Sequence, residues 1–316
     1  MKASSISSSK NTSRGYLIAV VGTAIWSTTA IFIRYLNDAY GMPPMVVAFW
    51  RDFFVALVLI FTLVLFNHDL LRLDREHFRF VLGYGLSLAV FNSLWTVSVK
   101  MNGAAVATVL IYSSAAFTAL YERWFLNGSL GWRKILAILL SLGGCVMVAG
   151  VYDLAAWRLN PWGIVLGLFS GVGFSGYSLL GKKSAVKGID SWTALTHSFM
   201  VASLILLLFN FVPNWISDTS TLDQLFWLGD SLAGWGVLLL LAIGPSIGGY
   251  GLYTLSLHYL PASVSNLIAT LEPSLTAVLA YIFLGERFSN AQVVGSILIL
   301  LGVLILRLRE QYRNRV

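Results

Sequence analysis

The run "TLEPSLTAVLAYIFLGER" at positions 270–287 is strongly apolar, yet Glu272 and Pro273 stand together near its start. An apolar helix of about 20 residues spans the ~30 Å hydrocarbon core of a bilayer. An ionisable side chain is costly there, and proline removes a hydrogen bond from the helical backbone. The pair therefore predicts a special position in a membrane-spanning segment, where the acid either faces a polar cavity or is paired with another helix.

The whole chain has the composition of a membrane protein. Of its 316 residues, 57% are hydrophobic and only 11% are charged, and the mean hydropathy is +0.78. A soluble domain carries about 25% charged residues, so these charges are too few to cover a water-soluble surface of this size. The net charge is +7, but the cations stand between apolar runs, so we expect no nucleic-acid partner. The single cysteine, Cys145, excludes an intramolecular disulfide and a cysteine-based metal cluster.

Apolar runs of about 20 residues predict membrane-spanning helices. The chain contains ten, at 15–36, 45–66, 79–99, 104–125, 133–151, 161–182, 191–212, 234–257, 262–284 and 290–308. We therefore predict an all-α integral membrane protein with ten transmembrane helices, flanked by tails at 1–14 and 309–316.

The distribution of Lys and Arg predicts the orientation. With the N-terminus inside, 16 of the cations fall in inside segments and 5 in outside segments. Cytoplasmic loops carry the excess of Lys and Arg in membrane proteins. This favours a multi-pass protein of the cell membrane with both termini cytoplasmic and the lipid bilayer as its surroundings.

The two halves of the chain match each other. A shift of 158 residues places Thr96 on Thr254 and Gly144 on Gly302, and a shift of 148 places Arg34 on Lys182. At a shift of 146, Arg51 falls on His197. Two apolar sequences match somewhat by chance, but this register also holds through turns and polar positions. We call residues that coincide in this way repeat mates.

The matching halves are 15–155 and 156–308, each with five predicted spans. Five is an odd number, so the second copy has the opposite orientation in the membrane, and the architecture is an inverted 5+5 repeat. Inverted repeats are typical of secondary transporters, which bind their solute near the midplane between the repeats.

Four segments carry a resemblance to a known family: "WSTTAIFIRYL" (26–36), "AFWRDFFVALVL" (48–59), "LEPSLTAVLAYIFLGERFS" (271–289) and "GSILILLGVLIL" (295–306). They resemble the EamA-type permeases of the drug/metabolite transporter superfamily. In the first half, Ser114-Ala115 replaces Glu-Pro and 127–129 (Asn-Gly-Ser) replaces Gly-Glu-Arg. The resemblance implies a ten-helix exporter of small metabolites, with amino acids as the first expectation and peripheral fifth and tenth helices.

Glu272 is the leading candidate for a binding residue. It lies about ten residues from the predicted cytoplasmic end of its span, on one helical face with Ser265 and Thr276. A cavity-facing carboxylate here can bind a cationic group of the solute or a proton, which makes the proton a candidate coupling ion. The alternative is a structural hydrogen bond or ion pair between helices. Pro273 either exposes a backbone carbonyl to the cavity or only kinks the helix, and is a candidate hinge.

Arg51 and His197 are the second candidate pair. As repeat mates they carry basic side chains at similar depths from opposite membrane faces. They are candidates for solute binding, but Arg51 can also extend to the interface beside Asp52, and His197 can be an ordinary packed residue.

Mid-span aromatic residues are candidates for the wall of a solute cavity, since stacking and apolar burial suit organic solutes. These candidates are Trp26, Trp95, Tyr112, Tyr177, Tyr250 and Tyr253. Packing against lipid is the alternative for each. Gly244 and Pro245 are further candidate hinges in the eighth predicted span.

Three short patterns resemble enzyme motifs: "GPSIG" (244–248), "GVGFSG" (171–176) and "GYSLLGKK" (176–183). All lie in apolar spans without the preceding strand that their chemistry needs, so we expect no enzyme. A channel or another non-catalytic membrane protein remains the alternative to a transporter. The solute, the coupling ion, the direction of transport and the oligomeric state are not determined by the sequence.

Overall fold

The computed structural model describes residues 2–125, 130–151, 160–212, 222–284, 287 and 289–313. Within these ranges every regular element is a helix, which confirms the all-helical prediction. The elements are α1 (Lys2–Trp26), α2 (Thr29–Tyr40), α3 (Pro44–Phe66), η1 (His68–Leu71), η2 (Arg75–His77), α4 (Phe78–Tyr112), α5 (Ser114–Phe125), α6 (Trp132–Val148), α7 (Pro161–Val186), α8 (Ser191–Asn210), α9 (Leu222–Leu225), α10 (Leu232–Leu241), η4 (Ala242–Tyr250), α11 (Gly251–Tyr259), α12 (Ala262–Ala269), α13 (Glu272–Leu284) and α14 (Asn290–Arg313). The first-half counterpart of Gly-Glu-Arg at 127–129 and the last tail residues 314–316 lie outside the described residues.

Seven stretches of described helix are long and apolar enough to cross a membrane, so the chain is a multi-pass membrane protein. They cover seven of the ten predicted spans and are Asn11–Tyr40, Pro44–Phe66, Arg75–Met101, Pro161–Val186, Ser191–Asn210, Leu232–Tyr259 and Asn290–Arg307. The other three predicted spans, 104–125, 133–151 and 262–284, fall on shorter or interrupted helices. The count of ten therefore stays a prediction.

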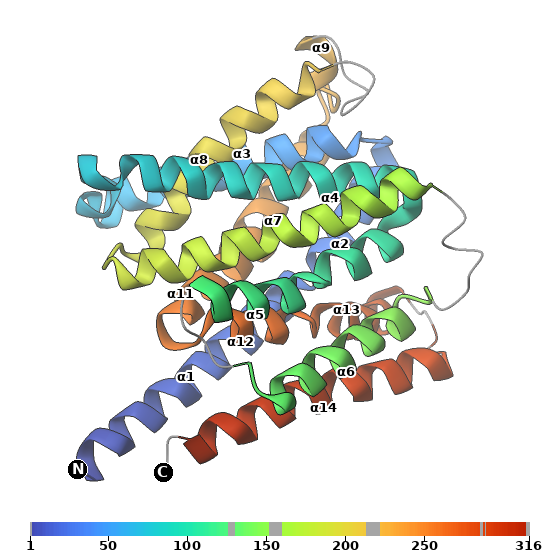
Figure 1. Cartoon of the computed structure of the whole chain (residues 1–316). Helices are drawn as coiled ribbons and strands as arrows, with labels where there is room; N and C mark the ends of the chain where they lie inside the picture. Colours follow the sequence, from blue (N-terminus) through green and yellow to red (C-terminus); the bar gives the residue numbers. More distant parts are fainter. Residues whose placement is uncertain are drawn as a thin grey trace.

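Helix α4 is an uninterrupted run of helical residues, but it reverses direction (Figure 1). A Cβ placed at Gly167 of α7 would meet both Ser98 and Leu110. These two residues would lie about 18 Å apart in a straight helix of 1.5 Å rise, so they reach the same glycine only if the chain turns back between them. The turn separates two limbs, which agrees with the prediction of separate spans at 79–99 and 104–125.

Helices α6 and α14 pack side by side with reciprocal contacts (Figure 1). A Cβ at Gly144 would clash with the backbone of Gly295, and a Cβ at Gly302 would clash with the backbone of Ala137. Gly144 and Gly302 are repeat mates, and so are Ala137 and Gly295. Because each contact is repeated with its partners exchanged, the two helices pack antiparallel as a two-fold relation requires.

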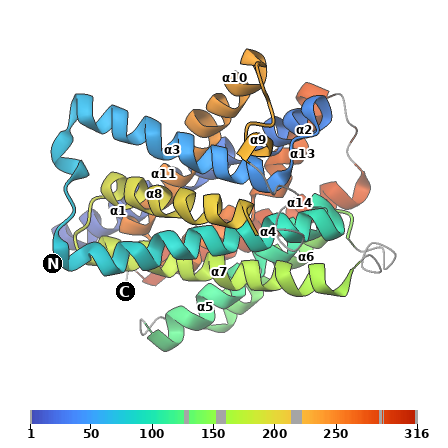
Figure 2. The ribbon, with the colours of Figure 1, turned by 90° about the horizontal axis from the view of Figure 1, so that it is seen from above.

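The chain ends lie at the same end of the molecule in both views (Figures 1 and 2). A chain that begins and ends on one side of a membrane crosses it an even number of times. The arrangement of the ends agrees with the even number of spans that the sequence predicts.

The helices that surround the centre of the molecule are interrupted. Breaks occur at Ser27–Thr28 between α1 and α2, at Ser113 between α4 and α5, and at Thr270–Leu271 between α12 and α13. Ser113 and Leu271 are repeat mates, so the break is present in the first half although Glu-Pro is missing there. Irregular backbone at membrane depth is tolerated where it is buried in protein or lines a cavity.

Two of the predicted hinges lie in irregular backbone and the third lies beside it. Gly244 and Pro245 are inside η4, a π-helical segment whose wider turns accommodate a proline in the middle of a span. Pro273 is the second residue of α13 and follows the break. Proline is tolerated in the first turn of a helix because the amide hydrogen there has no intrahelical acceptor.

A buried ion pair ties α5, α6 and α12 together. Lys134 Nζ donates to Glu122 Oε2 at 2.9 Å, and the Ser263 hydroxyl donates to the same oxygen. The side chains of Lys134 and Glu122 are only 7% and 6% exposed. Removing one partner of such a pair leaves the other charge buried without compensation.

We expect Glu122→Gln to destabilise the folded protein by about 3–5 kcal/mol, because Lys134 keeps its buried charge. The measurement is the unfolding midpoint of the purified protein in detergent. The double variant Glu122→Gln/Lys134→Met carries no buried charge here and should recover most of the loss. A single variant as stable as the parent would show that the pair does not stabilise the fold.

Candidate functional site

Two adjoining cavities lie where the interrupted helices meet. The deeper one, which we call the chamber, encloses about 530 Å³ counting the open space at its mouth, and the wider vestibule encloses about 1220 Å³ on the same measure. They adjoin each other, since five lining residues belong to both: Thr29, Arg51, Trp95, Thr108 and Glu272. The chamber is completed by Trp26, Phe91, Asn92, Ile111, Tyr112, Phe174 and Tyr250.

The vestibule opens away from the chain termini. Its walls come from α2 (Ile33, Arg34), the start of α3 (Val47) and the end of the first limb of α4 (Thr96, Val99). The elements that carry them, α2 and the start of α3, lie at the end of the bundle opposite the start of α1 (Figure 1). The site is therefore accessible from one end of the molecule in this conformation.

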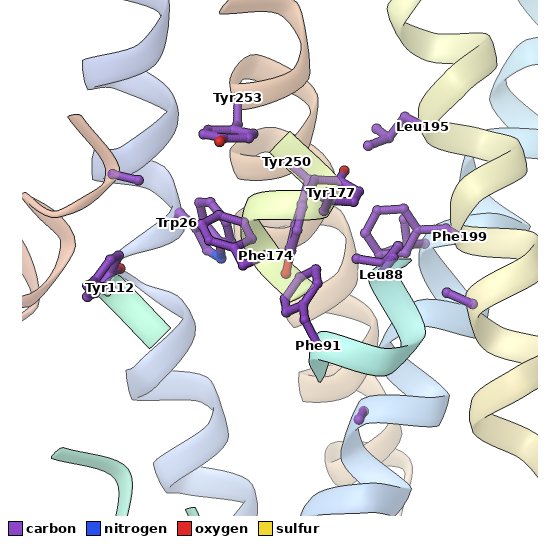
Figure 3. Packing of buried hydrophobic residues seen from close by; sticks show 14 of the residues in the cluster. Trp26, Leu88, Phe91, Tyr112, Phe174, Tyr177, Leu195, Phe199, Tyr250 and Tyr253 are labelled. Atoms are coloured by element: carbon purple, nitrogen blue, oxygen red, sulfur yellow. The ribbon is translucent and has the colours of Figure 1, made fainter. Parts of the chain in front are cut away.

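Aromatic side chains close the other end of the chamber. The ring of Trp26 lies 4.4 Å from Tyr250, 5.9 Å from Phe174 and 5.8 Å from Tyr253, between ring centroids. Figure 3 shows Trp26, Phe174 and Tyr250 gathered in one group, with Tyr112 to one side. Trp26 is the last residue of α1, so the break that follows places the indole in this group.

Glu272 lies in the chamber wall at the start of α13, and the Tyr112 hydroxyl donates a hydrogen bond to its Oε2. An acid followed by proline is a favourable start for a helix, because the carboxylate sits at the positive end of the helix dipole. The pair that looked anomalous within one long span is thus a second helix beginning at mid-span. Ser265 and Thr276, predicted on the same face, instead bond to Ser256 Oγ at 2.9 Å and to the Ser27 carbonyl at 3.1 Å.

Arg51 also reaches both cavities, but its charge is neutralised. Its Nε donates to Asp52 Oδ1 at 2.9 Å, and Asn92 donates to the other carboxylate oxygen at 3.2 Å. Asp52 is fully buried and Arg51 is 5% exposed, so the guanidinium does not extend to the membrane interface. Among the described residues, no cation lies within ion-pairing distance of Glu272. The side chains of Arg51, Asp52 and Glu272 therefore carry a net charge of −1 when all three are ionised.

Three predicted site residues are not among those lining the two cavities. His197 Nδ1 lies 2.9 Å from the Thr193 carbonyl of its own helix. Tyr177 stacks on Tyr84 at 4.6 Å, and the Tyr253 hydroxyl lies 2.6 Å from Ser178 Oγ. Their role in solute binding stays a prediction.

Several lining residues were not singled out from the sequence. Thr29, Asn92 and Thr108 are isolated small polar residues in apolar helices and form no pattern. The one available signal was the repeat register, which places Thr108 on Asn266 and makes both halves polar at this level.

The sequence resembles one family along nearly its whole length. A model of the EamA-like transporter family matches residues 13–150 and matches again at 161–308. The chain belongs to the EamA-like transporter family. The double match falls on the two halves found by comparing the chain with itself, and membership confirms the resemblance to the drug/metabolite transporter superfamily.

Several relatives have printed functions. The chain is 26% identical over 301 residues to the "Probable amino-acid metabolite efflux pump" of Escherichia coli (strain K12), covering 92% of this chain and 93% of that protein. It is 27% identical to the threonine/homoserine exporter RhtA of Salmonella typhimurium (strain SL1344), over 76% and 75% of the two chains. It is 22% identical to the S-adenosylmethionine uptake transporter of Rickettsia bellii (strain RML369-C), over 94% and 93%.

A solved crystal structure shares the fold, with a TM-score of 0.73 at 18% identity over 94% of this chain and 97% of the other. At this identity the likeness concerns the fold alone. The family match identifies the chain as a membrane transporter of the EamA-like family.

We expect Trp95→Ala to raise the KM for a transported solute about three- to tenfold, because an aromatic wall of both cavities is lost. Counterflow into proteoliposomes measures the change. Trp132→Ala is the matched control, since Trp132 is 68% exposed on α6 and is not among the residues that line the two cavities. Equal effects of the two replacements would contradict a solute site in this chamber.

Proposed function

We propose that the protein is a secondary transporter that exports small organic solutes such as amino acids, by alternating access around the chamber. The observation that carries the proposal is a central cavity that is open at one end of the bundle and closed at the other by Trp26, Phe174 and Tyr250. A carrier needs such one-sided access, whereas a channel needs a continuous path.

The proposed architecture is an inverted repeat of two halves, 15–155 and 156–308, with ten spans and both termini cytoplasmic. The reciprocal contacts of α6 and α14 support it, as do the repeat mates Ser113 and Leu271 at helix breaks. In that orientation the vestibule faces the outside of the cell membrane.

The charges at the chamber favour a solute with an amine. Glu272 carries the carboxylate that has no cationic partner among the described residues, while Arg51 is already paired with Asp52. A protonated amine that replaces water beside Glu272 makes a charge-assisted hydrogen bond in an apolar setting. Amines of amino acids fit this site, and the printed names of two relatives, an amino-acid metabolite efflux pump and a threonine/homoserine exporter, agree with that class.

A proton can occupy the same carboxylate. Binding of a proton from one side and of the amine from the other would exchange the two across the membrane. Proton coupling of this kind uses one buried acid and needs no second titrating group.

We expect Glu272→Gln to abolish solute uptake driven by a pH gradient, because the amide cannot exchange a proton. Counterflow of radiolabelled amino acids, measured in the same proteoliposomes, separates two roles. Retained counterflow supports proton binding alone, and loss of both activities in a folded protein supports pairing with the solute amine. Glu76→Gln, in the exposed η2 segment, is the matched control. If Glu272→Gln leaves both activities at parental levels, Glu272 has only a structural role.

We expect a reporter fused after Val316 to be cytoplasmic, because an even number of spans returns the chain to its starting side and the inside segments hold 16 of the cations. Alkaline phosphatase, active only outside, and green fluorescent protein, fluorescent only inside, form the paired assay. Phosphatase activity at this position would overturn the proposed topology.

A further inference from the structure

At the closed end of the cavity, the last turns of α7 and α11 are bonded to each other. Lys182 Nζ donates to the Leu257 carbonyl at 2.7 Å. A Cβ at the neighbouring Gly181 would lie 2.6 Å from the Leu257 side chain, so the two helices are in close contact there. Leu257 itself is fully buried.

A second layer of polar contacts lies between this contact and the chamber. Asn266 Nδ2 donates to Ser178 Oγ at 3.0 Å, and its Oδ1 accepts from Ser114 Oγ at 2.9 Å. Ser178 also bonds to the Tyr253 hydroxyl at 2.6 Å. The two layers join α5, α7, α11 and α12 and close the path below the aromatic group.

The repeat mates of these residues lie at the open end. Arg34 is the mate of Lys182, Val99 of Leu257, and Trp95 of Tyr253. Thr108 is the mate of Asn266, and Glu272 is the mate of Ser114. All five line the vestibule or the chamber in this conformation: Arg34, Val99, Trp95, Thr108 and Glu272. These five positions thus line the cavity at one end, while their repeat mates are hydrogen-bonded or in close contact at the other end.

We propose that the hydrogen bond from Lys182 to the Leu257 carbonyl is a gate that closes the inner end of the cavity. In the other conformation, a hydrogen bond from Arg34 to the Val99 carbonyl is the equivalent gate at the outer end. The two gates form in turn. When the outer gate closes, Arg34 leaves Asp38, which it now meets at 3.5 Å, and Lys182 releases Leu257. The inference rests on the proposed alternating access, since it assigns the residues that hold each end shut.

The two ends are not equivalent in strength. The buried pair of Glu122 and Lys134 joins α5 and α6, and Glu122 also accepts from Ser263 of α12, the helix that carries Asn266 of the second layer. The repeat mates of the pair are Ala280 and Gln292, which cannot form an ion pair. Closure of the inner end therefore has a stabilising contact that closure of the outer end lacks. This favours the outward-open conformation when no solute is bound.

The test uses the alkylation rates of two cysteines at mate positions, in a Cys145→Ala background that removes the native thiol. Val99→Cys reports the outer end and Leu257→Cys reports the inner end, and both keep the backbone carbonyl that the gate uses. Purified protein in detergent reacts with a water-soluble maleimide, so the readout depends neither on membrane orientation nor on a solute. In the background protein, Val99→Cys should react at least about tenfold faster, because Leu257 is buried and Val99 lines the vestibule.

Lys182→Met should raise the rate at Leu257→Cys and lower the rate at Val99→Cys, by about tenfold each, since a hydrogen bond from a charged group is lost at the inner gate. Lys183→Met removes the same charge from the exposed neighbouring position and should change neither rate. Lys182→Arg keeps a donor and should behave as the parent. Adding Arg34→Met to Lys182→Met weakens the opposite gate and should return both rates toward parental values.

Opposite changes at the two ends, reversed by Arg34→Met, distinguish a pair of gates from general loosening. Parallel increases at both cysteines, or no change with Lys182→Met, would overturn the proposal. If the alkylation rates change as expected but the protein transports no amine, the gates are supported and the proposed function is refuted. Transport with unaffected alkylation rates would refute the gates alone.

Discussion

A bilayer offers no water to a backbone that leaves the helical hydrogen-bond pattern, and the central part of this protein is built around that constraint. Interruptions at Ser27–Thr28, Ser113 and Thr270–Leu271 lie inside the protein, with Ser27, Thr270 and Leu271 buried. The Thr270 carbonyl, released by the break, receives the thiol of Cys145 at 3.7 Å. Because the breaks need partners, they gather at one place, and the residues beside them, Trp26, Tyr112 and Glu272, become the walls of one chamber.

The same place gathers the charges that the hydrocarbon would not accept singly. Arg51 and Asp52 neutralise each other, and Asn92 satisfies the second carboxylate oxygen. Glu272 accepts a hydrogen bond from the hydroxyl of Tyr112. A single carboxylate in an aromatic chamber attracts a cation or a proton, and this preference is a property of the three groups together. None of them alone would predict it.

The two halves are similar but not identical in sequence, so the two ends of the molecule share some contacts and differ in others. Repeat mates such as Gly144 and Gly302 make the same contacts with their partners exchanged. Substitutions that break the symmetry include Glu272 against Ser114, Arg51 against His197, and Lys134 against Gln292. These differences make the two ends of the molecule chemically unequal.

The sequence by itself determined that the protein lies in a membrane, that it is all-helical, that its two halves match and that it resembles the EamA family. The length of apolar runs and the register of the repeat can be read directly along the chain. The sequence also singled out Glu272 and Pro273, although as an anomaly in one long helix rather than the start of a second one. The tertiary structure decided that α4 turns back on Gly167, that Asp52 neutralises Arg51, and that Tyr253 and Tyr177 lie outside the cavity wall. These outcomes depend on which faces of two helices pack together and how closely the helices approach. Such contacts join residues far apart in the chain, and they produce no periodic pattern in the sequence of either helix.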